Sequence, residues 1–199
     1  MRRALVTLVG LASLAAAASP AAAAYYDIDP LTREPLQAYG QPSSDPSLRP
    51  QASAIPRERV TAPWSYGAGT IVINTSERRL YYMLGDGSAI RYGIGVGRPG
   101  FTWAGTRSIT MKREWPDWRP PAQMLRRRPD LPRYMPGGLD NPLGARAMYL
   151  GGTLYRIHGS NEPESIGQAV SSGCIRMTNE DVTDLYERAR VGTRVVVLR

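Results

Sequence analysis

The chain contains a series of short apolar runs, each interrupted after a few residues by glycine, asparagine or aspartate. The runs at 70–74, 79–84 and 89–96 are rich in β-branched and aromatic residues, which pack well on a pleated sheet. Asp86-Gly87 separates the second run from the third and predicts a hairpin, because its turn needs backbone angles that glycine tolerates. Consecutive short strands of this kind predict a β-sandwich or a β-barrel.

The second half of the folded region adds more strands and one helix. Further apolar runs at 106–111, 147–150, 154–158 and 193–198 predict strands. Between 178 and 189 the apolar residues recur at helical spacing, with Thr178 or Asn179 placed to cap the first turn and Gly192 placed to end the helix. The folded region is therefore predicted to be mainly β, with one short helix near its end.

Residues 115–146 break the strand pattern. This segment is rich in proline, glycine and arginine, and it holds Trp115 and Trp118, with Trp103 just before it. A stretch this long with little regular structure inside a compact domain is usually a lid or a binding loop. The tryptophans favour a surface that faces a ligand. A solvated insertion is the alternative, and Trp103 could equally belong to the core.

The first 63 residues have the composition of a leader and a linker. Met1-Arg2-Arg3, an apolar run over 4–14 and small residues up to Ala24 follow the layout of a secretory signal peptide. The apolar run is short for a membrane anchor, since about 20 residues are needed to cross the hydrocarbon core. Residues 25–63 contain seven prolines, which block helices and central strands. We therefore expect a signal peptide over 1–24, a flexible linker over 25–63, with a tether or docking strip as its alternative, and a folded domain over 64–199.

The charge balance and the cysteine count exclude several classes of protein. Basic residues outnumber acidic ones by 25 to 17, for a formal net charge of +8, which suits an anionic setting such as cell-wall polymer or a membrane surface. No recognition motif or basic helix supports binding to nucleic acid. One cysteine excludes an intrachain disulfide framework, and a free thiol in an exported protein suggests a use for it.

The only histidine and the only cysteine, His158 and Cys174, lie 16 positions apart. An imidazole can hold a thiolate and shuttle its proton, so the pair predicts a cysteine nucleophile with His158 as its base. A backbone carbonyl or the Ser160 hydroxyl could orient that imidazole. One cysteine and one histidine are too few ligands for zinc, and we expect neither a metal nor a cofactor. The alternatives are a buried, inert thiol and an ordinary hydrogen-bonded histidine.

The residues around Cys174 suit acyl transfer through a thioester. Gly173 lets the backbone approach a bound carbonyl closely, and the amides of Gly173 and Cys174 are candidate oxyanion donors, each typically worth about 3 kcal/mol. Arg176 would add positive potential near the thiol, and it would bind a substrate carboxylate or form a surface ion pair. The other candidate substrate-binding residues are Ser171, Ser172 and Gly159.

Residues 157–181, and above all the run Ser171-Ser172-Gly173-Cys174-Ile175-Arg176-Met177, resemble the L,D-transpeptidase catalytic domain, the YkuD-like family of cell-wall enzymes. Pro142-Leu143-Gly144 and Gly95-Val96-Gly97 extend the resemblance, which covers roughly residues 66–198. It implies a β-sandwich of mixed strands, a short helix after the cysteine motif and a long lid loop over the active site. It also implies the same roles for Cys174 and His158, with Gly173 and Arg176 near the substrate.

The implied reaction is an attack on a peptidoglycan stem peptide. The cysteine displaces the terminal D-alanine of a tetrapeptide stem, holds the stem as a thioester and passes it to an amine. The acceptor partner is another stem, or an outer-membrane protein or lipoprotein. The family commonly has histidine where Ser172 stands, which bears on how the substrate is oriented and the thiolate tuned. An L,D-carboxypeptidase and a non-catalytic cell-wall-binding module remain alternatives. The signal peptide implies a periplasmic location.

Overall fold

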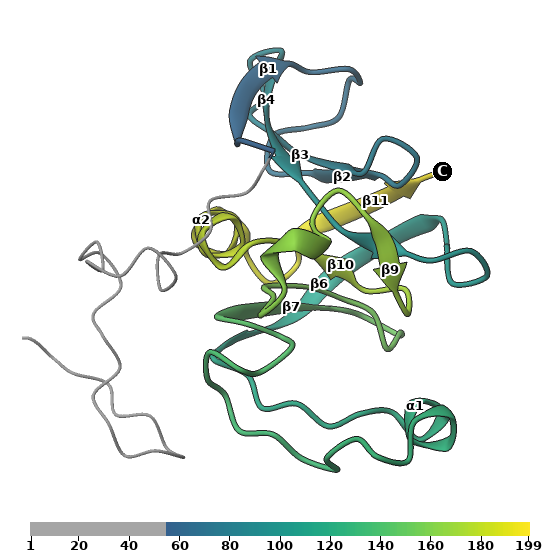
Figure 1. Cartoon of the computed structure of the whole chain (residues 1–199). Coiled ribbons are helices and arrows are strands. Elements are labelled where there is room, and N and C mark those ends of the chain that lie inside the picture. The colour runs from purple at the N-terminus through teal and green to yellow at the C-terminus, as the bar shows by residue number, and fades with distance from the viewer. Residues whose placement is uncertain (1–54) are drawn as a thin grey trace, which may run out of the picture.

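The computed structural model describes residues 55–199, so the expected signal peptide and most of the expected linker lie outside the described residues (Figure 1). Within this range the strands form a nine-stranded sheet and a two-stranded sheet. The strands are β1 (Glu58–Thr61), β2 (Ile71–Asn74), β3 (Arg79–Met83), β4 (Ser88–Gly93), β5 (Val96–Gly97), β6 (Gly105–Glu114), β7 (Arg146–Leu150), β8 (Arg156–His158), β9 (Ala169–Ser171), β10 (Ile175–Arg176) and β11 (Arg194–Leu198).

The large sheet is mixed, as predicted. Its strand order is β1-β4-β3-β2-β11-β6-β7-β8-β10. The pairs β2–β11 and β8–β10 are parallel, and the other neighbours in this sheet are antiparallel. The predicted hairpin is the β3–β4 pair, with Gly85 and Gly87 at positive φ in its turn. The small sheet is the parallel pair β5–β9.

β6 joins the two halves of the sandwich. Its first residues pair with β11, its later residues pair with β7, and the register shifts between Ile109 and Met111. The sheet turns at this strand, so that the halves above and below it in Figure 1 face each other. One buried cluster takes side chains from both halves and from the helix, including Ile73, Leu80, Val195, Met148, Leu150, Ile157, Val182 and Leu185. The predicted β-sandwich is confirmed.

The folded part begins earlier than the sequence indicates. β1 lies in the segment expected to be a linker, yet it pairs with β4, and Glu58 forms an ion pair with Arg91 of that strand. An edge strand needs one hydrogen-bonded neighbour and can be mostly polar, so β1 lacks the hydrophobic alternation on which sequence assignment depends. Trp64 then packs edge-on against Tyr81, with ring centroids 5.3 Å apart. The linker prediction therefore does not hold for residues 58–61.

The helix α2 (Asn179–Arg188) follows the cysteine motif as predicted. Its N-cap is Thr178, whose hydroxyl accepts a hydrogen bond from the Asp181 amide at 3.2 Å. The helix ends at Arg188, four residues before the predicted stop at Gly192, where Ala189 adopts an extended conformation. The Lys112 ammonium donates to the Tyr186 and Ala189 carbonyls at 2.6 and 2.7 Å, which suits the negative end of a helix.

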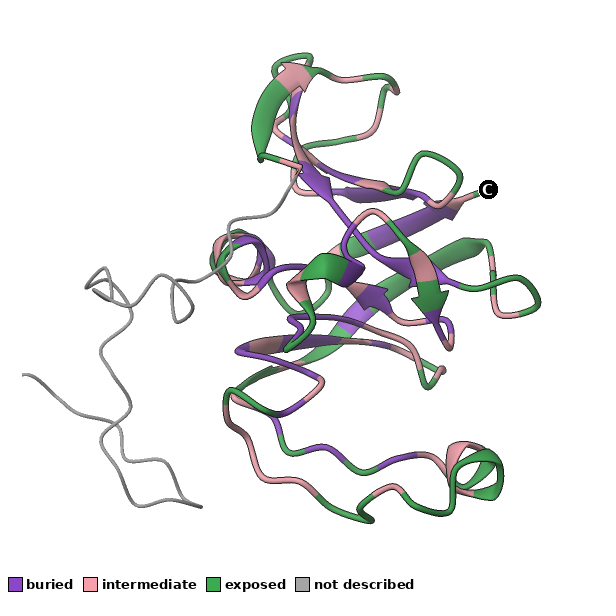
Figure 2. Cartoon of the chain, viewed as in Figure 1, coloured by how far each residue is buried: buried purple, intermediate pink, exposed green. Residues whose placement is uncertain are grey.

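Burial follows the two halves of the sandwich. Figure 2 shows buried positions along β2 and β11, whereas the segment 115–146 is mostly exposed or intermediate. The only helix within this segment is α1 (Ala122–Arg127), which has no buried residue. In the described range, 55–199, no helix combines the length and the apolar character needed to span a bilayer.

Candidate active site

Two short parallel strands bring the predicted nucleophile and base together. In the register of β8 and β10, Ile157 lies opposite Ile175. Both isoleucines are buried in the core, at 0% and 1% exposure. Because side chains alternate along a strand, their neighbours stand on the other face of the sheet. That face carries Arg156, His158, Cys174 and Arg176, and all four line one cavity.

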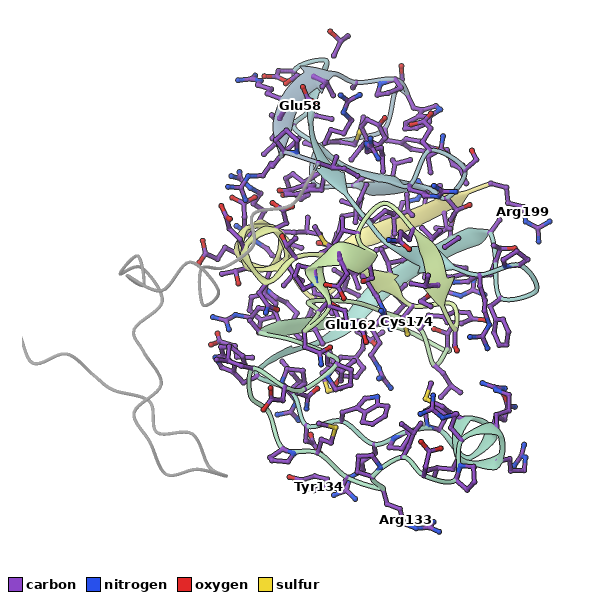
Figure 3. The ribbon with its side chains drawn as sticks, viewed as in Figure 1. Glu58, Arg133, Tyr134, Glu162, Cys174 and Arg199 are labelled. Atoms are coloured by element: carbon purple, nitrogen blue, oxygen red, sulfur yellow. The ribbon has the colours of Figure 1, made fainter. Side chains whose placement is uncertain are left out.

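The cavity has a volume of about 1250 Å³ and lies between these strands and the segment 115–146, called the lid from here on. The lid contributes mainly apolar and basic side chains to the cavity wall, among them Trp118, Met124, Arg127, Leu131 and Met135. Figure 3 shows Cys174 and Glu162 at the edge of the sandwich that faces the lid, while Arg133 and Tyr134 point away on its outer side. The segment therefore covers the site, as predicted.

The two arms of the lid are joined by a backbone bridge between Trp118 and Met135, and by one buried asparagine that sequence analysis did not single out. Asn141 is 1% exposed. Its side-chain amide donates to the carbonyls of Pro116 and Pro136, at 3.1 and 2.8 Å, and its oxygen accepts from the Leu143 amide at 2.9 Å. One side chain thus ties the two ends of the lid together. The only signal in the sequence is its position before Pro142 at the end of the irregular segment.

A stack of cationic and aromatic groups joins the lid to the rest of the site. The guanidinium carbons of Arg98 and Arg127 lie 4.5 and 5.4 Å from the ring centroid of Phe101. Arg127 belongs to α1 in the lid, whereas Arg98 and Phe101 follow β5. The Arg98 amide also donates to the Ser171 carbonyl at 3.0 Å, which connects this stack to the cysteine loop.

His158 is held in one tautomer by its own backbone. The ring is 4% exposed, and Nδ1 lies 2.6 Å from the Gly159 carbonyl oxygen. Because a carbonyl only accepts hydrogen bonds, we assign the proton to Nδ1, which leaves the lone pair of the neutral ring on Nε2. Of the two predicted orienting groups, the structure uses a backbone carbonyl. The Ser160 hydroxyl accepts instead from the Glu162 amide at 3.0 Å.

Burial keeps both reactive groups neutral. Burial, together with the charges of Arg176 and Arg156, lowers the pKa of His158 to about 3, although the hydrogen bond to Gly159 raises it. Burial also raises the pKa of the Cys174 thiol, although Arg156 and Arg176 oppose that shift. The sequence predicted a thiol helped to ionise by Arg176. In the resting protein burial outweighs that help, so the pair is a thiol and an uncharged imidazole.

Gly173 is required by the packing of the cysteine loop. It has a φ of +108°, and a Cβ there would lie 2.4 Å from Cε1 of Tyr155. Tyr155 stacks on Trp103 with centroids 4.8 Å apart, and the Trp103 indole donates to the Gly173 carbonyl at 3.0 Å. Trp103 thus supports the cysteine loop and packs against the main core, which was the second of its two predicted roles.

The serines of the cysteine loop have different surroundings. The Gly173 amide, predicted to be an oxyanion donor, donates to the Ser171 hydroxyl at 3.1 Å, and that hydroxyl donates to the Cys174 carbonyl at 2.6 Å. Ser171 and the Gly173 amide are therefore satisfied within the loop. Ser172 is half-buried and lines the cavity. Of the two predicted oxyanion amides, the Gly173 amide already has an acceptor, so the Cys174 amide is the better candidate.

Gly159 and Arg176 have structural partners. A Cβ at Gly159 would lie 2.3 Å from Oδ1 of Asn179, which accepts from the Ala145 amide at 2.8 Å, so glycine is needed for this close approach. Gly159 is buried beside the cavity and is not among its lining residues. Arg176 lines the cavity and forms an ion pair with Glu162 at 2.6 Å. Of the two partners predicted for Arg176, the ion pair is the one observed, and its charge also acts to lower the pKa of the Cys174 thiol, as predicted.

Arg156 is a site residue that sequence analysis missed. It lines the cavity, and its guanidinium carbon lies 5.3 Å from the ring centroid of Tyr149. Its Nε is buried and has no hydrogen-bond partner within residues 55–199. The signal was available, because a residue two positions before His158 on a strand must share the face of that histidine. In the same range, no three His, Cys, Asp or Glu side chains are placed to hold a metal ion together.

Comparisons with known proteins agree with this geometry. Residues 68–197 match the family model described as the L,D-transpeptidase catalytic domain, YkuD. The probable L,D-transpeptidase ErfK/SrfK of Escherichia coli K12 is 40% identical over 137 residues, which cover 64% of this chain and 43% of that protein. A putative L,D-transpeptidase of Fuscovulum blasticum, from the ATP synthase subunits region, is 36% identical over 137 residues, covering 67% of this chain and 71% of that protein.

The fold also matches solved structures. An L,D-transpeptidase from Mycobacterium smegmatis superposes with a TM-score of 0.51 at 19% identity, over 65% of this chain and 58% of that one. At that identity the likeness concerns the fold. The chain spans less than half the length of the Escherichia coli relative.

Proposed function

This chain belongs to the L,D-transpeptidase catalytic domain family, and from that premise we propose that it is a peptidoglycan L,D-transpeptidase with Cys174 as nucleophile and His158 as general base. One observation carries the proposal. A thiol and a neutral imidazole of fixed tautomer share one face of adjacent strands and line one cavity. The donor is the tetrapeptide stem of peptidoglycan, and the products are a cross-link and free D-alanine.

The first half of the reaction forms a thioester. Cys174 Sγ attacks the carbonyl carbon that precedes the terminal D-alanine, while Nε2 of His158 takes the thiol proton. Because the resting pair is neutral, this proton moves as the sulfur attacks rather than beforehand. The Cys174 amide stabilises the oxyanion that results. When the C–N bond breaks, Nε2 returns the proton to the leaving nitrogen, and D-alanine departs as a free amine.

The second half transfers the stem to an acceptor. An amine attacks the thioester carbonyl, and Nε2 of His158 accepts its proton. The C–S bond then breaks, the sulfur recovers a proton from His158, and a new amide bond is left. The apolar side chains of the lid keep water away from the thioester, which favours an amine over hydrolysis. The acceptor is another stem, or an outer-membrane protein or lipoprotein.

We place this reaction in the periplasm. Support comes from residues 1–24, which have the layout of a signal peptide, and from residues 25–57, which have the composition of a tether between the leader and the folded domain. The net charge of +8, or +6 once Arg2 and Arg3 leave with the signal peptide, suits a protein that works beside anionic wall polymer. The proposed partners are peptidoglycan stem peptides, with no role for nucleic acid, metal or cofactor.

The chain without residues 1–24 should release D-alanine from a disaccharide tetrapeptide, and mass spectrometry should find cross-linked dimers. Cys174→Ala should reduce both products to the level of a blank, because no other thiol exists in the chain. Its thermal unfolding should stay unchanged, which separates lost chemistry from lost structure.

Other outcomes identify the alternatives. Shortened stems without dimers would assign an L,D-carboxypeptidase. Equal D-alanine release by wild type and Cys174→Ala would contradict the proposal outright. A protein that sediments with sacculi, releases no D-alanine and is not acylated by a carbapenem at Cys174 would be a binding module.

A further inference from the structure

Two arginines flank the nucleophile, and they differ in their partners. Arg176 lies two residues after Cys174 and is paired with Glu162. Arg156 directly precedes Ile157, the partner of Ile175, so the register places it beside Cys174 across the two strands. Within residues 55–199, Arg156 forms no ion pair with a carboxylate. Arg156 is therefore the uncompensated positive charge next to the nucleophile.

The guanidinium of Arg156 lines the cavity and contacts an aromatic ring, and its Nε has no hydrogen-bond acceptor in the described range. Its guanidinium carbon lies over the Tyr149 ring at 5.3 Å, which is within the range of a cation–π contact. Such a contact uses the flat face of the group and involves none of its N–H groups. One of them, Nε, is buried and without an acceptor in the described range. A buried donor without a partner is costly, so its retention in a cavity indicates an acceptor that arrives with the ligand.

A planar, charged fork of this kind is best satisfied by a carboxylate bound in bidentate fashion. We propose that Arg156 determines specificity by binding a carboxylate of the donor stem close to the scissile bond. The inference rests on the proposed transpeptidase function. The donor offers two such groups, the terminal carboxylate of the leaving D-alanine and the side-chain carboxylate of the diamino acid that is attacked. Arg176 does not compete for them, because Glu162 already occupies its guanidinium.

Three donors distinguish the two sources of the carboxylate. They are the tetrapeptide with both carboxylates free, the same peptide ending in D-alaninamide, and a peptide whose diaminopimelate side chain is amidated. Wild type should lose about tenfold or more in kcat/KM on the one donor that lacks the bound carboxylate, mainly through KM, because a charged hydrogen-bonded pair is lost. The other amidated donor should react like the free acid.

Arg156→Gln should reduce kcat/KM on the free-acid donor by the same factor. It should then react equally well with that donor and with the amidated donor that wild type disfavours. Arg156→Lys keeps the positive charge but not the planar guanidinium. Its kcat/KM on the free-acid donor should therefore lie between those of wild type and Arg156→Gln. Arg146→Gln is the matched control. Arg146 is also partly buried on the same sheet and lies over an aromatic ring, Tyr186, but it pairs with Glu114 and does not line the cavity. That variant should discriminate among donors as wild type does.

Binding can be followed without turnover. In a Cys174→Ala background, calorimetry should show the tetrapeptide bound about tenfold more weakly when Arg156→Gln is added. Thermal unfolding of each variant shows whether it is folded. If Arg156→Gln is not folded, Arg156→Lys provides the comparison instead. The inference is overturned if the ratios of kcat/KM between the free-acid donor and the two amidated donors are the same in Arg156→Gln as in wild type. If wild type releases no D-alanine from any donor, the transpeptidase assignment fails instead.

Discussion

The strands β8 and β10, which carry the reactive residues, and the lid above them are held in place by different means. The two strands are fixed by a hydrogen-bonded register and by Ile157 and Ile175, which are buried in the main core. The lid is fixed by the polar contacts of Asn141, by the backbone bridge between Trp118 and Met135, and by the stack on Phe101. The positions of Cys174 and His158 therefore depend on the stability of the whole sandwich, whereas cover over the cavity depends on a few local contacts.

Shortening a core side chain under the site should destabilise the entire domain. Ile175→Ala removes a buried side chain that faces Ile157, and such substitutions typically cost about 2–5 kcal/mol of unfolding free energy. Denaturant unfolding should shift as a single transition, and tryptic cleavage in the lid should rise only as far as global unfolding does. A lid that became sensitive to protease in an otherwise stable variant would contradict this separation of the two regions.

Removing the asparagine of the lid should act locally. Asn141→Ala leaves the carbonyls of Pro116 and Pro136 without their donor, at a cost of roughly 1–3 kcal/mol. Trypsin should then cut after Arg126 or Arg127 at least about tenfold faster, while the melting temperature falls less than in Ile175→Ala.

Asn161→Ala is the matched control, because Asn161 also donates to a lid carbonyl, that of Asp140, but from an exposed position. It should leave the cleavage rate near that of wild type. Equal effects of the two substitutions would show that Asn141 has no special role.

The pH dependence of Cys174 links the two regions. Burial raises the pKa of the thiol, so alkylation by iodoacetamide should keep increasing above pH 9, with no plateau near neutrality. In Asn141→Ala a loosened lid admits water to the cavity, which lowers the desolvation cost of the thiolate and should move the profile to lower pH. A thiol that already reacts fully at pH 7 in wild type would contradict the neutral pair, and an unchanged profile in the variant would mean that the lid does not set this pKa.

Much of the strand pattern could be predicted, because β2, β3 and β11 are apolar runs bounded by turn residues. β9 and β10 have only three and two residues, too few for any period to be recognised. β1 is mostly exposed and thus has no apolar face to detect. In the site, the pairing of His158 with Cys174 followed from the residue types and the family resemblance. The hydrogen bond to Gly159, the occupied Gly173 amide and the dominance of burial over charge depend on three-dimensional packing and could not be predicted.

Sequence analysis missed Arg156 for a different reason, which concerns strand pairing. Its place beside Cys174 follows from strand alternation once β8 and β10 are known to be neighbours, but that pairing joins segments 18 residues apart in sequence (175 minus 157). The lid is similar, since Asn141 contacts residues on both sides of an irregular loop that has no periodic signal. Sequence patterns identify the longer apolar strands and say little about which strands pair with each other.

The position of β11 has a consequence for how the molecule is made. This strand, the last in chain order, lies between β2 and β6 and pairs with both. Until residues 194–198 are available, the half of the sheet that begins with β1 and the half that carries Cys174 have no strand to connect them. Contacts between such distant segments form slowly, because a long loop must close first. We therefore expect the reactive thiol to be positioned late in folding, and a chain cut short before β11 should present no working site.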